Sequence, residues 1–198
     1  MESSDGAART LPQIVENYRD YEPPRQLRGL IEDLLADVPA KYLVGLKTIL
    51  LTNRKALSRD QRRQRVPVRK GVFPLAQALG AYYKATRSRP AYVLILVDNT
   101  LSSWPTWVLR APLFRYWALS NVLYHEIGHH IHQAIEPVYD GKENVADKWM
   151  GKLGSRFTRR HYWYLRPITY PAGKILKLMT KTAVWKRMEA RAQRRLRR

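Results

Sequence analysis

The sequence predicts an α+β domain in which a small mixed β-sheet packs against two helices. Short runs of β-branched and aliphatic residues, clearest in AYVLILVDN at Ala91–Asn99, are bounded by turn residues in the first half of the chain. From about Phe114 the apolar pattern becomes helical and continues to Pro137, and a second helical pattern follows it. The chain of 198 residues is long enough to bury one sizeable core.

An amphipathic helix is expected at the start of the domain. In PPRQLRGLIEDLLADVPAKYL, apolar residues recur at helical spacing and Pro39 limits the helix; they are Leu27, Leu30, Ile31, Leu34 and Leu35. The next run, VGLKTILLT at Val44–Thr52, is short, aliphatic and bounded by Gly45 and Asn53. This pattern predicts a strand.

The segment between the first two clear strands is harder to interpret. The basic block Asn53–Lys70 has no apolar periodicity, which predicts a long loop. The following stretch VFPLAQALGAYYKA is ambiguous, although Tyr82 and Tyr83 favour a strand for its second half.

The nearly continuous apolar run Ala91–Asn99 predicts a buried central strand that Asp98 and Asn99 bring to an end. After it, Pro105 and Pro112 interrupt any long helix. We therefore expect a short edge strand at Trp107–Leu109.

The C-terminal half is expected to be helical. The second helix would begin at Asp140 as N-cap and end near Gly151 or Gly154, and a last helix would cover about 172–197. The predicted organisation is an N-terminal polar segment at 1–25, one domain at 26–155 and a basic, aromatic and helical extension at 156–198.

Composition limits the chemistry that is available. The chain has no cysteine, which excludes thiolate catalysis and cysteine-bound zinc, so any metal must be held by His, Asp or Glu. No apolar run approaches the roughly 20 residues of a membrane-spanning helix, and the N-terminus lacks the pattern of an export signal. We expect a cytoplasmic protein without a transmembrane segment.

The formal charge of +20 is concentrated in blocks, above all at 53–70, 156–166 and 185–198. Such blocks favour polyanions, either nucleic acid or an anionic membrane surface. The alternative is that they are solvated loops and tails without a partner.

The stretch NVLYHEIGHHIHQAIEP contains the motif H-E-x-x-H at His125, Glu126 and His129. Residues four apart project from the same face of a helix, so the two imidazoles can bind one metal ion, with Glu126 beside them as a general base. His132 lies about 10.5 Å further along the helix than His125, too far to share an ion bound at about 2.1 Å. His130 points elsewhere, toward packing or solvent.

A catalytic zinc site needs a third protein ligand from outside this helix. The three-histidine pattern fails because position 135 is Ile135, but ENVAD downstream places Glu143 and Asp147 on one face of the next helix. Glu143 can complete the site, while Asp147 accepts a hydrogen bond from the far nitrogen of a ligating histidine. Gly128 would allow the second helix to approach closely. Glu143 also fits a capping box with Asp140, and this role competes with metal binding.

H-E-x-x-H followed by E-x-x-A-D resembles the gluzincin class of zinc metallopeptidases, and the order of elements resembles its minimal single-domain, zincin-like members. The resemblance covers roughly Val44–Leu153. It implies one zinc ion bound by His125, His129 and Glu143, with Glu126 as the general base and Asp147 supporting a ligand.

If the site is a peptidase, the transition state needs one further donor for the oxyanion. Candidates are His161, Tyr162, Tyr164 and Tyr139, although the HYWY run also fits an aromatic packing cluster. A protein or peptide substrate would pair in extended form with the expected edge strand at Trp107–Leu109. The main rival is a basic protein that binds nucleic acid or an anionic membrane through 53–70 and 185–198, in which the metal is structural or lost.

Overall fold

The computed structural model describes residues 11–68, 71–109, 112–137 and 142–163. The chain divides into two compact units, Met1–Gly154 and Ser155–Arg198. Among the described residues, no helix combines the length and the apolar composition needed to cross a bilayer. The predicted metal ligands all belong to the first unit.

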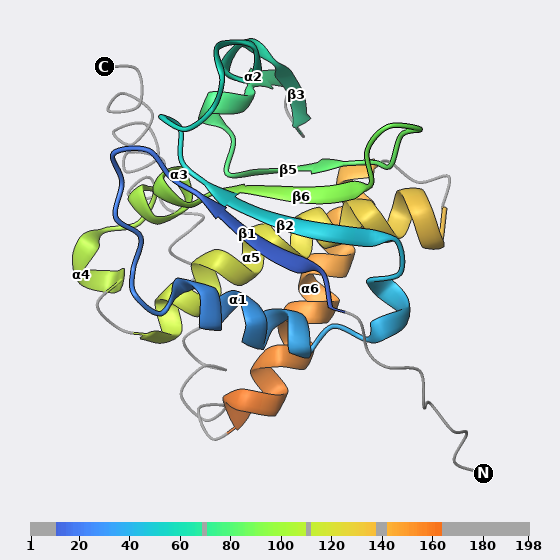
Figure 1. Cartoon of the computed structure of the whole chain (residues 1–198). Coiled ribbons are helices and arrows are strands. Elements are labelled where there is room, and N and C mark those ends of the chain that lie inside the picture. Colours follow the sequence, from blue (N-terminus) through green and yellow to red (C-terminus); the bar gives the residue numbers. More distant parts are fainter. Residues whose placement is uncertain (1–10, 69–70, 110–111, 138–141, 164–198) are drawn as a thin grey trace. The chain divides into compact units, whose positions relative to one another are not determined.

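The first unit is built on a four-stranded sheet with the order β1 (Gln13–Asn17), β2 (Leu46–Thr52), β6 (Ala91–Leu96) and β5 (Gly80–Tyr83) (Figure 1). The first three strands are parallel and β5 runs antiparallel to β6. The expected small mixed sheet is therefore confirmed, as is the central position of β6. Strand β1 lies within the segment interpreted from the sequence as polar, where its Ile14 is buried.

Helices cover one face of this sheet. Helix α1 (Leu27–Ala36) and helix α5 (Pro112–His130) lie along it in Figure 1, and α5 continues into a π-helical turn at Ile131–Ile135. The predicted apolar face of α1 is buried completely, at Leu27, Leu30, Ile31, Leu34 and Leu35. Burial of these side chains, about 1.5–3 kcal/mol each, stabilises the helix against the sheet.

A small subdomain packs on the β5 and β6 part of the opposite face of the sheet, in a region where the sequence pattern wrongly predicted a loop. Residues of the basic block form helix α2 (Arg59–Arg63) and strand β3 (Arg65–Val68), which pairs with β4 (Gly71–Pro74). A capping box between Ser58 and Gln61 starts the helix. Leu57 and Leu75 then anchor the subdomain in a cluster with Ala78, Ala81, Leu94 and Leu96.

Two further sequence predictions are corrected. Strand β6 ends at Leu96, and Asp98 and Asn99 lie in the next helix, α3 (Val97–Ser102). The Asn99 side-chain amide donates to the carbonyls of Ala76 and Ala78, at 3.0 and 2.8 Å, so a buried hydrogen-bonding role places this polar residue here. The expected edge strand at Trp107–Leu109 is instead part of the short helix α4 (Thr106–Leu109).

The second helix of the site, α6 (Lys142–His161), runs past both glycines at which the sequence predicted its end. A Cβ atom at Gly151 or Gly154 would meet no other atom within 4 Å, so these glycines mark neither a tight contact nor a cap. A single glycine inside a helix costs only about 1 kcal/mol, and the surrounding turns outweigh that cost. The predicted N-cap at Asp140 and the last helix at 172–197 lie outside the described residues.

Candidate metal centre

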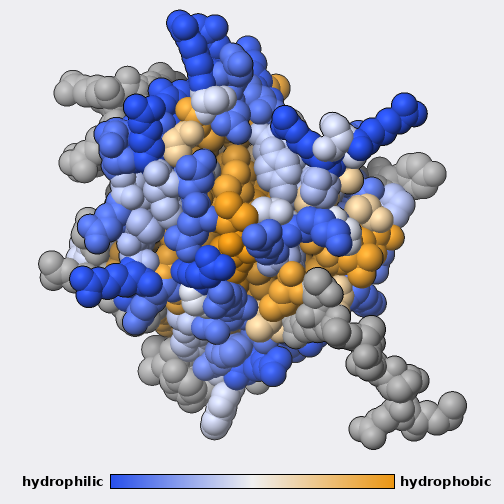
Figure 2. Space-filling model, in the orientation of Figure 1, coloured by the Kyte–Doolittle hydropathy of each residue, from blue (hydrophilic) through white to orange (hydrophobic). Residues whose placement is uncertain are grey.

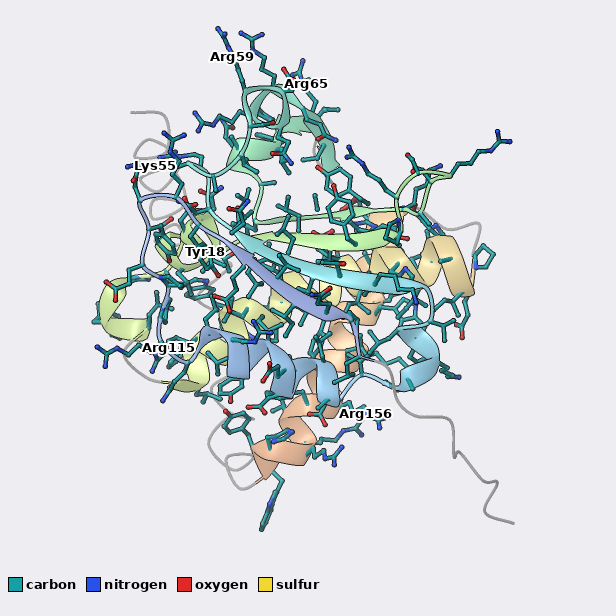
Figure 3. All side chains as sticks on the ribbon, in the orientation of Figure 1. Tyr18, Lys55, Arg59, Arg65, Arg115 and Arg156 are labelled. Atoms are coloured by element: carbon teal, nitrogen blue, oxygen red, sulfur yellow. The ribbon has the colours of Figure 1, made fainter. Side chains whose placement is uncertain are left out.

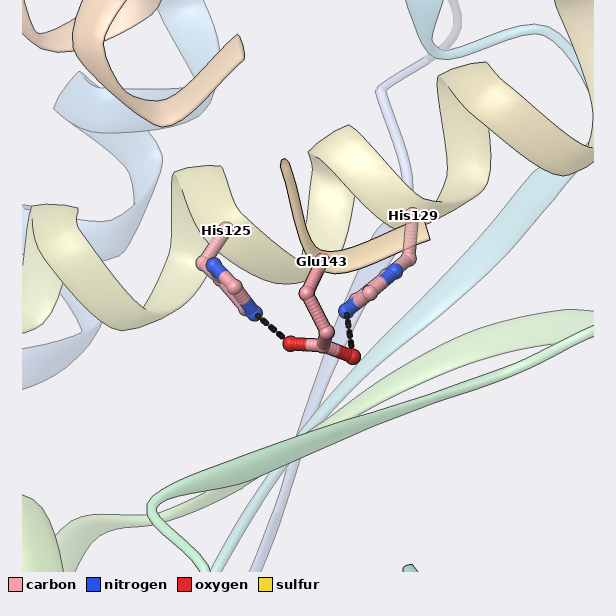
Figure 4. A group of neighbouring side chains, drawn as sticks. All are labelled: His125, His129 and Glu143. Carbon is pink, nitrogen blue, oxygen red and sulfur yellow. Dashed lines mark ion pairs between the residues drawn. The ribbon is translucent and has the colours of Figure 1, made fainter. Parts of the chain in front are cut away.

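Three side chains from two helices meet at one point. His125 and His129 project from α5, and Glu143 projects from the first turn of α6 (Figure 4). The Nε2 atom of His125 lies 3.5 Å from Oε2 of Glu143, and Nε2 of His129 lies 3.6 Å from Oε1. One donor atom from each residue falls within 4.8 Å of the others. Among the described residues, this is the one group of three or more His, Asp or Glu arranged in this way.

The distances and donor types fit a zinc ion. Ligand atoms about 2.0–2.1 Å from a tetrahedral zinc lie about 3.3 Å from one another. Each histidine lies close to this distance from one of the two Glu143 oxygens, and the group as a whole is wider, at up to 4.8 Å. Two imidazole nitrogens and one carboxylate oxygen leave a fourth position for water, as in catalytic sites. The three side chains are 13–26% exposed, so the centre is sheltered but accessible.

The close approach of α6 to α5 depends on a glycine between the two histidines. A Cβ atom at Gly128 would lie 2.8 Å from both the Cα and the carbonyl oxygen of Ala146, and 3.1 Å from Cβ of Trp149. Since backbone atoms cannot yield as a flexible side chain can, any larger residue at 128 would push α6 away. The sequence predicted this close approach, which brings Glu143 within reach of both histidines.

Asp147 lies on the other side of one imidazole. Its Oδ1 is 3.1 Å from Nδ1 of His125, whose Nε2 faces Glu143. A carboxylate accepts a hydrogen bond from Nδ1–H, and this tautomer leaves the Nε2 lone pair available to a metal. One helical turn of α6 therefore supplies both a candidate ligand and the group that orients a second ligand.

Glu126 is buried beside the cluster. Burial, and after it the negative charge of Glu143, raises the pKa of the Glu126 carboxyl to about 8, while a hydrogen bond from the Tyr82 backbone amide opposes the shift. Glu126 also packs against Gly80, since a Cβ atom there would lie 3.1 Å from its Oε1. A carboxyl group whose pKa lies near neutrality suits proton transfer at neutral pH.

The two remaining histidines of α5 and its extension are not part of the cluster. His130 is buried, and its Nε2 lies 3.0 Å from the Val44 carbonyl while Nδ1 lies 3.2 Å from the Tyr82 hydroxyl. Because a carbonyl only accepts, the proton of the neutral ring sits on Nε2. Burial lowers the pKa of His130, which favours this neutral form. His132 is buried in the π-helical turn.

The described structure covers two of the four candidate oxyanion donors. Tyr139 and Tyr164 lie outside the described residues. His161 and Tyr162 belong to the second unit, where their rings contact Phe157 with centroids 4.6 and 5.9 Å apart. This contact agrees with the alternative of an aromatic packing cluster.

The contribution of β5 to the site was not expected from the sequence. Gly80 and Tyr82 face Glu126 and His130, whereas Trp107–Leu109, the expected edge, is helical. Strand β5 forms the edge of the sheet beside this site. A glycine inside an apolar run is the one signal that could have indicated it, because glycine in a strand often marks a close approach.

Comparison with known protein families and with curated proteins found no match for this sequence.

Proposed function

We propose that this protein is a zinc-dependent metallopeptidase of gluzincin type. The observation that carries the proposal is the convergence of His125, His129 and Glu143, with Asp147 behind one histidine and Glu126 buried beside them. Each of these five side chains is of a type that zinc-dependent peptide hydrolysis uses: two imidazoles and a carboxylate as ligands, a second carboxylate behind a ligand and a third as base. Spacing along two helices and the contact between those helices support the same assignment independently.

In the proposed reaction, His125, His129 and Glu143 hold one zinc ion, which when bound lowers the pKa of water toward 7 and polarises the scissile carbonyl. Glu126 takes the proton of the attacking water and delivers it to the leaving amine. Asp147 keeps His125 in the tautomer that presents Nε2. The partial exposure of the cluster makes it reachable from solvent.

The substrate in this proposal is a protein or peptide bound in extended form. Strand β5 replaces Trp107–Leu109 as the edge against which it would pair, because β5 is the outer strand of the sheet and contacts Glu126. An extended peptide beside β5 would bring its carbonyl groups close to the base. This placement follows from the corrected fold.

The decisive experiment measures metal and activity together. Full-length protein purified without a histidine tag or added zinc should contain nearly one zinc per chain and should cleave a fluorescent casein substrate. Glu126→Gln should keep the zinc and lose the cleavage, because an amide cannot accept the proton of water. No zinc after reconstitution, or equal turnover by both proteins, would refute the proposal.

The surface around α2 supports a second candidate function, the binding of a polyanion. Residues 54–65 carry six basic side chains against one acid, Asp60, and all six are exposed: Arg54, Lys55, Arg59, Arg62, Arg63 and Arg65. Figure 2 shows hydrophilic side chains over this region, and in Figure 3 Lys55, Arg59 and Arg65 project outward. Arg62 turns back to donate to the carbonyls of Leu57 and Lys55, which holds the turn together.

In this second candidate function, the basic side chains bind a polyanion and the metal is structural or lost. The other basic segment, 185–198, lies outside the described residues. Titration with a labelled oligonucleotide and with anionic vesicles, each at several salt concentrations, tests it. A polyanion-binding protein without zinc or cleavage would favour this candidate over the peptidase, and binding together with cleavage would combine them.

A further inference from the structure

Gly80 lies directly against the side chain that the proposed function uses as its base. A Cβ atom added there would lie 3.1 Å from both Cγ and Oε1 of Glu126, and 2.8 Å from Cγ1 of Val122. Contacts under 3.0 Å are essentially never made by real Cβ atoms, and contacts of 3.0–3.4 Å force the neighbour to move. The Glu126 side chain therefore uses space that only glycine leaves open.

The backbone of the same strand holds the carboxylate. The amide of Tyr82 donates a hydrogen bond to Glu126. The Leu96 amide donates to the Leu79 carbonyl at 2.8 Å, and the ladder continues with Gly80 opposite Ile95. Because bonded and non-bonded pairs alternate in an antiparallel ladder, the Tyr82 amide points away from β6. The Glu126 carboxylate accepts a hydrogen bond from this outward-pointing amide.

The Tyr82 side chain fastens β5 to α5 at a second point. Its hydroxyl lies 3.2 Å from Nδ1 of His130, one helical turn beyond Glu126. The other ring nitrogen of His130 is 3.0 Å from the Val44 carbonyl. A short edge strand is thus tied to the helix on both sides of the ligand His129, which restricts its movement relative to the candidate centre.

We propose that Gly80 is a positioning residue for Glu126, acting together with the Tyr82 amide to set where the base lies. The inference rests on the proposed function and adds to it the strand that orients the base. Gly80 has no side chain and so leaves space for the Glu126 carboxylate, and the Tyr82 amide donates a hydrogen bond to it. A side chain at position 80 moves the carboxylate away from that amide, and the three atoms nearest to its Cβ belong to Val122 and Glu126, not to a proposed zinc ligand.

The first test compares two glycine-to-alanine variants of the full-length, zinc-loaded protein on fluorescent casein. Gly80→Ala should keep its zinc and a KM within about twofold of wild type, while kcat falls at least about tenfold, because a base displaced from its productive position fails mainly in the chemical step. Gly29→Ala is the matched control, since nothing lies within 4 Å of its added Cβ atom. An unchanged kcat in Gly80→Ala would overturn the proposal.

A second-site variant separates positioning from packing. In Gly80→Ala combined with Val122→Ala, the 2.8 Å contact is removed but both 3.1 Å contacts with Glu126 persist. We expect thermal stability to recover to that of Val122→Ala alone, while kcat stays low. Recovery of kcat together with stability would show that Gly80 only accommodates Val122.

A measurement without substrate tests the same contact in the metal-free protein. With ¹⁵N-tyrosine labelling, the Tyr82 amide should exchange slowly in wild type and in Gly29→Ala. In both Gly80→Ala and Glu126→Ala it should exchange about tenfold faster or more, as expected when a hydrogen bond is removed. Equal exchange in wild type and Gly80→Ala would refute the Gly80 inference even if the wild type is an active peptidase. If the wild-type protein is inactive but exchange is faster in Gly80→Ala, the inactivity refutes the peptidase proposal and the contact between Gly80 and Glu126 still stands.

Discussion

The Nδ1 atom of His125 lies 3.1 Å from Oδ1 of Asp147, on the opposite side of the ring from Glu143. This contact joins α5 to α6 and presents Nε2 to the candidate metal position. Because Glu143 and Asp147 are one turn apart on α6, the helix contacts both ring nitrogens of His125, Nε2 through Glu143 and Nδ1 through Asp147. Zinc affinity should therefore depend on Asp147 as well as on the ligands themselves.

Asp147→Ala should weaken zinc binding by about 10–100-fold without abolishing it, because in the proposed site Asp147 orients the ligand His125 and does not itself bind the ion. Competition with a chromophoric chelator measures the affinity. Glu136→Gln, an exposed acid outside the cluster, is the control and should bind zinc as wild type does. If the two variants are equal, Asp147 has no supporting role.

His125→Ala, His129→Ala and Glu143→Ala should each abolish tight zinc binding, because each removes one of the three proposed protein ligands. His130→Ala should retain zinc but lower the free energy of unfolding by about 1–3 kcal/mol, since it removes a buried side chain and its hydrogen bonds to the Tyr82 hydroxyl and the Val44 carbonyl. Metal analysis and urea unfolding distinguish the variants that lose zinc from the His130→Ala variant, which loses only stability. Full zinc in Glu143→Ala would mean that another residue is the third ligand.

Gly128→Ala should lower the free energy of unfolding by about 1–3 kcal/mol and weaken zinc binding, because its Cβ atom would meet the Ala146 backbone at 2.8 Å. Gly151→Ala on α6 is the matched substitution in open space, and it should raise stability by up to about 1 kcal/mol. Chemical unfolding of both variants checks the signs. Equal effects would contradict the close helix contact.

Alkaline pH should destabilise the protein through Tyr83. Burial, followed by the neighbouring Tyr92, raises its pKa from 10.0 to about 12 in the folded chain. The unfolded chain therefore loses this proton first, so the stability contribution is complete below pH 10 and disappears as the pH rises toward 12. Between about pH 9 and about pH 11, unfolding free energy should fall less in Tyr83→Phe than in wild type. Identical slopes would mean that Tyr83 is not buried as described.

If the basic surface binds nucleic acid, Arg59→Ala combined with Arg65→Ala should weaken binding and make its salt dependence shallower. The log–log slope should change by up to about 0.9 for each duplex phosphate that the variant no longer neutralises. Deletion from Lys186 removes seven basic residues and one acid, and should act in the same direction. Zinc content should stay constant in both variants. Unchanged affinity for oligonucleotide and for anionic vesicles would reduce both segments to solvated surface.

Local patterns predicted α1 from an apolar face with helical spacing, and β2 and β6 from short aliphatic runs bounded by turn residues. They failed in the basic block, where α2 is held by a capping box and by Leu57 and Leu75 packing on the sheet. They failed also at Trp107–Leu109, where the interruption of any long helix by Pro105 and Pro112 suggested a strand and the chain forms the short helix α4. Short elements depend on their tertiary neighbours more than on their own composition.

The sequence by itself determined which residues of the candidate centre can act together, because the four-residue spacings of His125 with His129, and of Glu143 with Asp147, place each pair on one helical face. Only the tertiary structure decided that β5 supplies Gly80 and the Tyr82 amide to Glu126. Helical spacing is a property of consecutive residues. The contact of a strand with a helix more than forty positions away depends on strand order and packing, and no local pattern in the chain encodes it.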